Sequence, residues 1–338
     1  MKICIIGAGS IGGLLAVRLA NSGFAVTVVA RGAHLKAIQD EGLRLVDADG
    51  NEQHARGPHG FRAVGSIADA GVHDVVILGM KAHQLAAVAP ELHHLFHLET
   101  IVVPMQNGIP WWYFQRHGGA YEGNRVNAVD ADGVIASSID PERIIGCVVY
   151  PAAEIAAPGL IRLIEGNRFP MGELDGRTTT RITELSAAFE HAGFKAPVLD
   201  NIRAEIWLKL WGNHTFNPIS ALTRATLVDI CRFPHTRELA VAMMLESQAI
   251  ANKLGIEFRV PLEKRIAGAE KVGRHKTSML QDIEAGREPE LDALVGSVIE
   301  LGKLTSTPTP HIYAVYACGK LLAKVMGDEK VYIRAAAI

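Results

Sequence analysis

The sequence predicts a two-domain α/β protein in which an open parallel sheet comes first and an all-α domain follows. Short apolar, β-branched runs alternate with helical segments in the N-terminal part, a pattern typical of parallel sheets covered by helices. Beyond residue 200 the composition favours helices alone. The length of 338 residues fits two domains of about 150 residues each. We therefore expect domains at 1–200 and 201–338.

The N-terminal elements follow one another closely. Residues 2–6 form a β-branched run, the glycine-rich segment 7–12 comes next, and helical character continues to Asn21-Ser22-Gly23. A second apolar strand at 25–30 completes a strand–helix–strand unit. Two more buried strands and a helical stretch between them are expected at 74–79, 100–103 and about 83–96.

The rest of the chain divides into hairpins, one last α/β unit and a series of helices. Prolines and glycines separate short strand-like pieces between 125 and 172, which predicts hairpins, and the last α/β unit is expected at 178–199. Two prolines make 305–310 a loop. The expected helices of the second domain are 201–216, 237–254, 260–284, 291–304 and 312–326.

The composition argues against several classes of protein. The 34 Lys and Arg residues oppose 36 Asp and Glu residues, so the net charge of -2 gives no positive field for a nucleic acid. The apolar run at 3–17 is too short to span a bilayer. Four distant cysteines form no C-x-x-C pair, and the histidines at 93, 94 and 97 form no recognised metal pattern. We expect a cytoplasmic protein without a metal.

The glycine-rich segment predicts a dinucleotide-binding turn, because G-x-G-x-x-G here follows a strand and opens a helix. The first glycine permits the turn, the second lets the backbone approach a pyrophosphate, and the third allows close packing of helix on sheet. N–H groups at the helix start attract phosphates. The alternative is a tight turn without a ligand. A Rossmann domain would contact its cofactor through Gly7, Ala8, Gly9, Ser10, Ile11 and Gly12.

The residue after the second strand selects the cofactor. An acidic residue there would bind a ribose 2′-hydroxyl, but this chain has Arg31, and the nearest downstream carboxylate, Asp40, is too far away to replace it. A guanidinium suits a 2′-phosphate through charge-assisted hydrogen bonds. Arg31 therefore predicts NADPH rather than NADH, and a solvated surface arginine is the alternative.

A polar face is predicted on the first helix of the second domain. Lys209, Asn213 and Asn217 recur at every fourth position and so share one side of the helix. Apolar neighbours such as Trp207 and Trp211 would desolvate the lysine and lower its pKa, which suits a proton donor. A helix lysine that extends its amine to water is the alternative.

Several motifs recur in one order along the chain: Gly7-x-Gly9-x-x-Gly12, Lys81-Ala82-His83-Gln84, Gln106-Asn107-Gly108, Asn201 to Lys209 with Asn213 and Asn217-Pro218, and Ser278 to Ile283 followed by Glu290-Leu291-Asp292. In order and spacing they resemble the ketopantoate reductase (2-dehydropantoate 2-reductase) family, NADPH-dependent enzymes of pantothenate synthesis. The resemblance extends over nearly the whole length of the chain.

The resemblance implies reduction of a 2-oxo acid to a 2-hydroxy acid. Lys209 would be the general acid that protonates the carbonyl oxygen as the nicotinamide delivers hydride. Lys81 would lie near the cofactor or the substrate carboxylate, and Asn107 would contact both cofactor and substrate. The residues that would bind the substrate are Asn107, Asn213, Asn217, Ser278 and Glu290.

Ordinary structural roles compete with four of these assignments. Asn107 begins an Asn-Gly pair that is common in turns, and Lys81 fits an exposed loop. Glu290 follows a proline and is expected in the first turn of a helix, where a carboxylate is favoured by the dipole. Ser278 is equally compatible with a structural role. The aromatic run at 111–114 cannot all point inward from a helix, and it fits either a cover for the cofactor or a subunit contact.

Two departures from the family pattern weaken the substrate assignment. The stretch at 223–229 lacks the expected Asn-Gly element, and 129–134 lacks a Thr-rich sequence. Changed cavity groups alter which substrate groups are satisfied. The alternatives are a related reductase or dehydrogenase acting on another 2-oxo or 3-hydroxy acid, and a catalytically silent NADPH-binding sensor. A homodimer through the helical domain is also expected.

Overall fold

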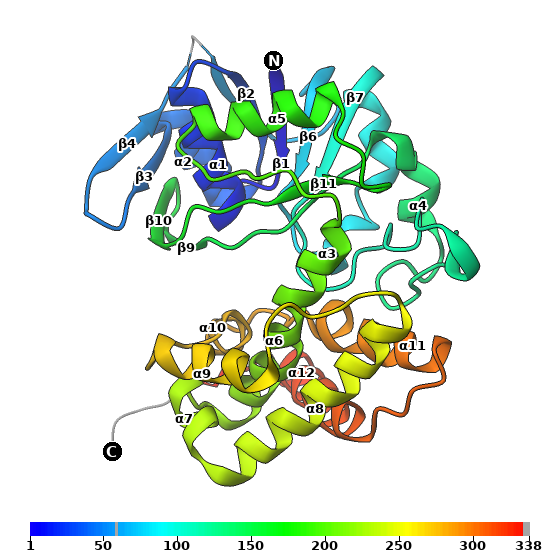
Figure 1. Ribbon diagram of the computed structural model, residues 1–338. Coiled ribbons are helices and arrows are strands. Elements are labelled where there is room, and N and C mark those ends of the chain that lie inside the picture. The colour runs from blue at the N-terminus through cyan, green and yellow to red at the C-terminus, as the bar shows by residue number, and fades with distance from the viewer. Residues whose placement is uncertain (58–59, 334–338) are drawn as a thin grey trace, which may run out of the picture. The chain divides into compact units, whose positions relative to one another are not determined.

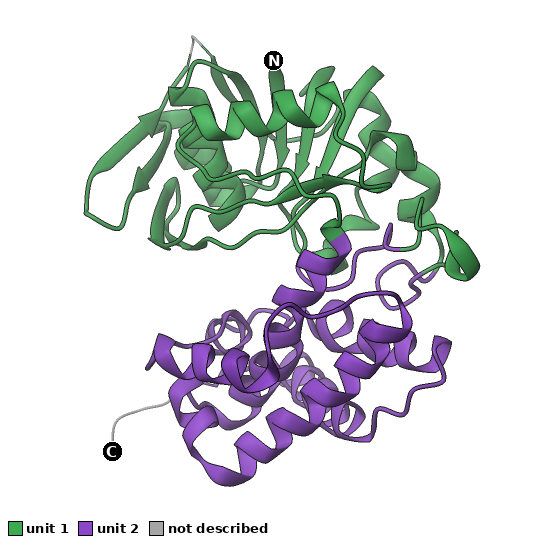
Figure 2. Cartoon of the chain, viewed as in Figure 1, with its two compact units in different colours: residues 1–106, 114–125, 132–202 green, residues 107–113, 126–131, 203–338 purple. Residues whose placement is uncertain are grey.

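The computed structural model describes residues 1–57 and 60–333, which form two compact units (Figure 2). Unit 1 consists of 1–106, 114–125 and 132–202, and unit 2 consists of 107–113, 126–131 and the chain from Arg203 onward. Two short segments from the N-terminal half therefore belong to the same unit as the C-terminal helices. Because of these segments, a single cut of the chain does not separate the units.

Unit 1 is built on a parallel five-stranded sheet in the order β5-β2-β1-β6-β7 (Figure 1). The expected open parallel sheet is confirmed. Central β1 has β2 on one side and β6 on the other, so the strand order reverses at β1, the position where α/β sheets bind ligands. The apolar strands form the core of the unit with α1. Their bounds are β1 Lys2–Ile6, β2 Ala25–Val29, β5 Phe61–Val64, β6 His73–Leu78 and β7 Phe96–Pro104.

A second sheet, of order β4-β3-β10-β9, packs against α1 and was not predicted from the sequence. The contact is close, because a Cβ on Gly13 of α1 would lie 2.6 Å from Cγ1 of Ile161. Of the expected hairpins, β9–β10 is present, whereas β8 pairs antiparallel with the more distant β11. The bounds are β3 Leu43–Val46, β4 Glu52–Ala55, β8 Ile145–Cys147, β9 Ala152–Ala157, β10 Leu160–Glu165 and β11 Met171–Glu173.

The helices of unit 1 agree only in part with the expectation. The single stretch predicted at 83–96 is wrong: a proline near the start of the 3-10 helix η1 separates it from the short α3, and residue 96 already belongs to β7. The unit predicted at 178–199 supplies a helix, followed by isolated bridges at Lys195 and Val198. The bounds are α1 Ser10–Asn21, α2 Gly32–Glu41, α3 Ala82–Leu85, η1 Ala89–Leu95, η2 Gly119–Tyr121, α4 Val134–Ser138, η3 Pro141–Arg143 and α5 Thr180–His191.

Unit 2 is helical, as expected, but its helices begin and end at different residues. The helix predicted at 260–284 is two helices, because Gly273 has φ +82° and Thr277 caps a new start. The helix predicted at 291–304 begins with a π-helical turn, η4. Helix α7 was not predicted. The bounds are α6 Ile202–Thr223, α7 Leu227–Arg232, α8 Pro234–Lys253, α9 Leu262–Val272, α10 Ser278–Glu284, η4 Asp292–Gly296, α11 Ser297–Leu304 and α12 Pro310–Glu329.

Within 1–57 and 60–333, no helix combines the length and the apolar character needed to cross a bilayer.

Candidate active site

The glycine-rich turn of unit 1 has the geometry of an anion site. Gly7 has φ +94°, a backbone conformation that favours glycine. A Cβ on Gly12 would lie 2.0 Å from the Gly7 carbonyl oxygen, so α1 can approach the turn this closely only because residue 12 is a glycine. A Cβ on Gly9 would meet nothing within 4 Å, which leaves open space in front of the turn. No side chain caps the start of α1, and its first turn carries no acidic residue. These features fit a pyrophosphate held by N–H groups of residues 8–12.

Arg31 and Lys81 each lie shortly after a strand of the parallel sheet. Arg31 is the second residue after β2, occupies the N-cap position of α2 and is exposed. Lys81 follows β6 and occupies the N-cap position of α3, where its backbone N–H donates to Oε1 of Gln84 at 3.3 Å. Both residues therefore come after parallel strands, at the edge of the sheet where ligands bind.

Gln106 joins the loops that follow β6 and β7. Its Nε2 donates to the carbonyl oxygen of Leu78 at 2.8 Å and to that of Met80 at 3.0 Å. The sequence analysis named Gln106 as part of a motif but gave it no role. Its bonds fix the end of β7 immediately before Asn107.

Helix α6 carries the polar face of unit 2. The side opposite Lys209 and Asn213 is held by buried groups: Nε1 of Trp211 donates to the Met244 carbonyl oxygen at 2.9 Å, and Nε2 of His214 lies 2.7 Å from Oγ of Ser247. Burial lowers the pKa of His214 to about 3, so this ring is neutral and structural. The anchored face fixes the rotation of α6 and with it the direction of the polar side chains.

Lys209 is half-buried and donates from Nζ to Oδ1 of Asn107 at 2.6 Å. Both residues belong to unit 2, although 102 positions separate them. Because its side chain accepts this short charge-assisted bond, Asn107 does more than form a turn. The bond also holds the ammonium group of Lys209 in one direction. Because an ammonium has three N–H donors, the bond to Asn107 uses one of them.

The loop that carries Asn107 is fastened to unit 2 at both ends. Gly108 has φ +92°, and a Cβ there would lie 2.0 Å from the carbonyl oxygen of Ala293 in η4, which also accepts from the Ile109 N–H at 3.2 Å. At the other end the Tyr113 hydroxyl accepts from Nε1 of Trp207 at 2.8 Å, and burial raises the pKa of Tyr113 to about 12. Sequence reasoning missed Ala293, and it singled out Tyr113 only as part of the aromatic run at 111–114.

The aromatic run at 111–114 is entirely buried, with each side chain at most 4% exposed. The expectation that some of the four must point outward is wrong, because the segment forms turns rather than a helix. Arg203 of α6 supports it, since its Nε donates to the Tyr113 carbonyl oxygen at 2.7 Å. Because all four side chains are buried, the aromatic run is part of the hydrophobic core.

A second hydrogen bond joins two of the predicted substrate residues. Nδ2 of Asn217, which is buried, lies 3.4 Å from Oγ of Ser278 at the start of α10. Thr277 caps α10 by accepting from the Leu280 N–H at 3.3 Å, so capping does not require Ser278.

Glu290 lies one residue before the helical segment that begins at Leu291, rather than inside the first turn. Its carbonyl oxygen accepts from the Leu294 N–H at 3.1 Å. Its side chain is half-buried. Glu290 and Ala293 are three residues apart, so the turn that receives Gly108 follows directly after Glu290.

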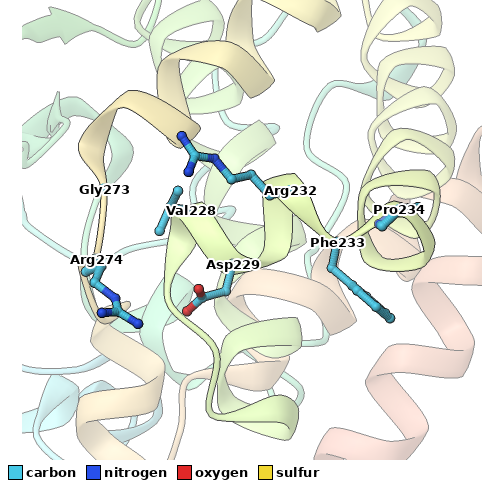
Figure 3. Close-up of a pocket in the computed structure, with 7 residues that line it drawn as sticks. All are labelled: Val228, Asp229, Arg232, Phe233, Pro234, Gly273 and Arg274. Atoms are coloured by element: carbon cyan, nitrogen blue, oxygen red, sulfur yellow. The ribbon is translucent and has the colours of Figure 1, made fainter.

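A pocket on unit 2 lies apart from these residues (Figure 3). It has a volume of about 610 Å³, and Asp229, Arg232 and Arg274 are among its side chains. Asp229 caps α7 by accepting from Thr226, and Nε of Arg232 donates to Glu270 at 2.8 Å. None of the predicted site residues lines this pocket. The last three residues of the stretch at 223–229, which departs from the family pattern, form the start of α7.

No group of three or more His, Cys, Asp or Glu side chains in the described part of the chain could hold a metal ion. His97, for example, places Nε2 3.1 Å from Oδ1 of Asp74 in an exposed pair.

Comparison with known proteins gives consistent matches. The family model for ketopantoate reductase PanE/ApbA matches residues 3–111, and the model for its C-terminal domain matches 201–323. A 2-dehydropantoate 2-reductase from Mesorhizobium japonicum is 52% identical over 97% of this chain and 99% of its own length.

Solved structures agree with these matches. A provisionally named ketopantoate reductase from Ralstonia solanacearum superposes with a TM-score of 0.90 at 40% identity, over 96% of this chain and 98% of that one. A D-mandelate dehydrogenase with NADH and anilino(oxo)acetate has a TM-score of 0.81 over 97% of this chain and 100% of its own. At 22% identity it shows the fold alone.

Replacing Gly108 tests how the Asn107 loop is held. Gly108→Ala should reduce the free energy of unfolding by about 3 kcal/mol, because the new methyl group meets the Ala293 carbonyl and the positive φ is strained. Gly255→Ala is the control in the same unit, since Gly255 has φ +78° and nothing within 4 Å of its added Cβ. It should cost about 1 kcal/mol. Urea unfolding measures both, and equal losses would contradict the close contact.

Proposed function

The chain belongs to the ketopantoate reductase family, and we propose that it catalyses the NADPH-dependent reduction of 2-dehydropantoate to pantoate in pantothenate biosynthesis. The two family models match segments that include both the glycine-rich turn and Lys209. The observation that carries the proposal is the hydrogen bond from Nζ of Lys209 to Asn107. A reductase of this kind needs a fixed cationic proton donor, and that bond provides one.

The proposed cofactor is NADPH, and when bound it supplies the hydride that adds to the substrate carbonyl carbon. The open space at Gly9 and the uncapped start of α1 support pyrophosphate binding at residues 7–12. The exposed guanidinium of Arg31 supports recognition of a 2′-phosphate. Lys81 and Asn107 are proposed as further cofactor contacts, since each closely follows a strand of the sheet.

Lys209 is proposed as the general acid. Hydride addition leaves negative charge on the former carbonyl oxygen, and an ammonium group beside it stabilises that charge and then donates the proton that completes the hydroxyl. The lysine is left as a neutral amine and regains its proton from water. Asn107 accepts one N–H of Lys209 and so restricts the position of the ammonium group that is proposed to face the substrate oxygen.

The substrate is proposed to bind the polar groups near this lysine. Asn213 and Asn217 follow Lys209 along one face of α6, and Ser278 lies against Asn217. Amide and hydroxyl donors suit the carboxylate of a 2-oxo acid, whereas the Glu290 carboxylate is an acceptor and suits a substrate hydroxyl. 2-Dehydropantoate carries both groups. The proposed substrate residues are Asn107, Asn213, Asn217, Ser278 and Glu290.

We also propose a homodimer and a cytoplasmic location. Helix α12 exposes the apolar side chains Tyr313, Leu321 and Val325, which supports association through the helical unit. The four cysteines are free thiols, which supports a reducing compartment.

A panel of substrates tests the proposed reaction. Purified protein with NADPH should give its highest kcat/KM on 2-dehydropantoate among a set of branched, aromatic and unbranched 2-oxo acids. A higher value on another 2-oxo acid, or on a 3-hydroxy acid in the reverse direction, would assign the chain to a related reductase. Cofactor binding without turnover of any member would instead indicate a silent sensor.

Lys209→Ala tests the proton donor. We expect kcat to fall at least about 100-fold, because removal of a general acid typically costs that much, while the Kd for NADPH stays within about twofold. Lys264→Ala is the control, since it removes an exposed lysine of α9 in the same unit. Retention of kcat in Lys209→Ala would remove the catalytic role.

Arg31→Ala tests cofactor choice. Loss of a charge-assisted contact to the 2′-phosphate should raise the Kd for NADPH about tenfold or more and leave the Kd for NADH unchanged. Lys36→Ala removes a similar charge from an exposed position on the same helix and should leave both constants unchanged. An unaltered ratio of the two constants in Arg31→Ala would refute the assignment.

A further inference from the structure

His34, in the first turn of α2, binds two backbone segments that are distant in sequence. Its Nε2 lies 2.7 Å from the carbonyl oxygen of Ala8 in the glycine-rich turn. The N–H of Gly159, between β9 and β10, donates to its Nδ1 at 3.0 Å. The side chain is half-buried. One imidazole thus joins α2 and the β9–β10 hairpin to the turn that precedes α1, all within unit 1.

The two partners determine the tautomer of the ring, that is, which nitrogen atom carries the proton of a neutral imidazole. A backbone N–H can only donate, so Nδ1 must accept and cannot carry a proton. The neutral ring then carries its proton on Nε2, which donates to the carbonyl oxygen of Ala8. Both nitrogen atoms are therefore used by the backbone.

This arrangement fixes one peptide plane of the turn. The peptide between Ala8 and Gly9 is planar and trans, so its C=O and N–H point in opposite directions. Because His34 holds the C=O on its own side, the N–H of Gly9 points away from His34. A Cβ on Gly9 would meet nothing within 4 Å, so there is room for a ligand beside this residue.

We propose that His34 is a positioning residue for the pyrophosphate of the dinucleotide: it holds the Ala8–Gly9 peptide so that the N–H groups at the start of α1 are already oriented for phosphate. This inference rests on the proposed use of the turn by a dinucleotide. His34 does not donate or accept a proton in the reaction. It also ties the turn to the helix that begins directly after Arg31.

Two amide substitutions of His34 test its two hydrogen bonds separately. In His34→Gln, the longer amide can place its Nε2 near the Ala8 oxygen and so retains the bond to the turn. In His34→Asn, the shorter amide can retain only the acceptor for Gly159 through Oδ1. Each variant loses one hydrogen bond, so a merely structural role predicts equal effects of the two substitutions.

The Kd values for NADPH and for NADH, measured by quenching of protein fluorescence, carry the test. We expect His34→Asn to raise both constants about tenfold, and His34→Gln to change them by less than threefold. At saturating NADPH the kcat of both variants should match that of the parent chain, because no reacting group is altered. Equal weakening by the two variants, or parental affinity in His34→Asn, would overturn the inference.

A measurement on the unaltered protein covers the case in which His34→Asn fails to fold. The imidazole 15N spectrum should show the Nε2–H tautomer for His34, and its signals should shift when NADPH is added. An Nδ1–H tautomer, or signals that NADPH leaves in place, would overturn the positioning role. Failure of the unaltered protein to bind either cofactor would instead overturn the proposed function.

Discussion

The candidate site depends on the hydrogen bond between Lys209 and Asn107, because that bond connects a helix of unit 2 with a loop that follows the sheet of unit 1 in sequence. A lysine side chain has four rotatable bonds and, without a partner, would sample many positions. The bond is short and one partner is charged, so it restricts the ammonium group strongly. Any proton transfer by Lys209 therefore depends on what holds Asn107 in place.

Asn107 is held by residues that take no part in chemistry. Gly108 can approach the π-helical turn only because it has no Cβ and tolerates a positive φ, and Tyr113 fastens the far end of the loop to Trp207. The π-helical geometry of η4 is itself rare and is often found at functional sites. The Asn-Gly pair thus both forms a turn and binds the Lys209 side chain, and the two explanations do not compete. Asn107 accepts the hydrogen bond from Lys209, and Gly108, which lacks a Cβ, allows the loop to pack closely against η4.

Local sequence predicts the parts of the fold that local physics determines. The buried strands at 2–6, 25–30 and 74–79 are continuous apolar runs, and the turn between the first two has its glycines at fixed spacing, so both were predictable. The second sheet was not, because β4 is largely polar and β3 pairs with β10, which lies more than 100 residues away in the sequence. The break in the helix predicted at 260–284 depends on one glycine with positive φ, which an apolar pattern does not reveal.

The same distinction separates the two kinds of residue in the site. Arg31 could be proposed from its residue type and its position after a strand, and Lys209 and Asn107 could be proposed because their motifs resemble those of a known family. Ala293, Tyr113 and His34 could not, because each acts through a partner at least 26 positions away. In two of these three cases, Ala293 and His34, the hydrogen bond uses a backbone carbonyl group, which every residue type carries. Sequence patterns therefore suggest candidates for the reacting groups of such a site more readily than the groups that orient them, which emerge only from the folded chain.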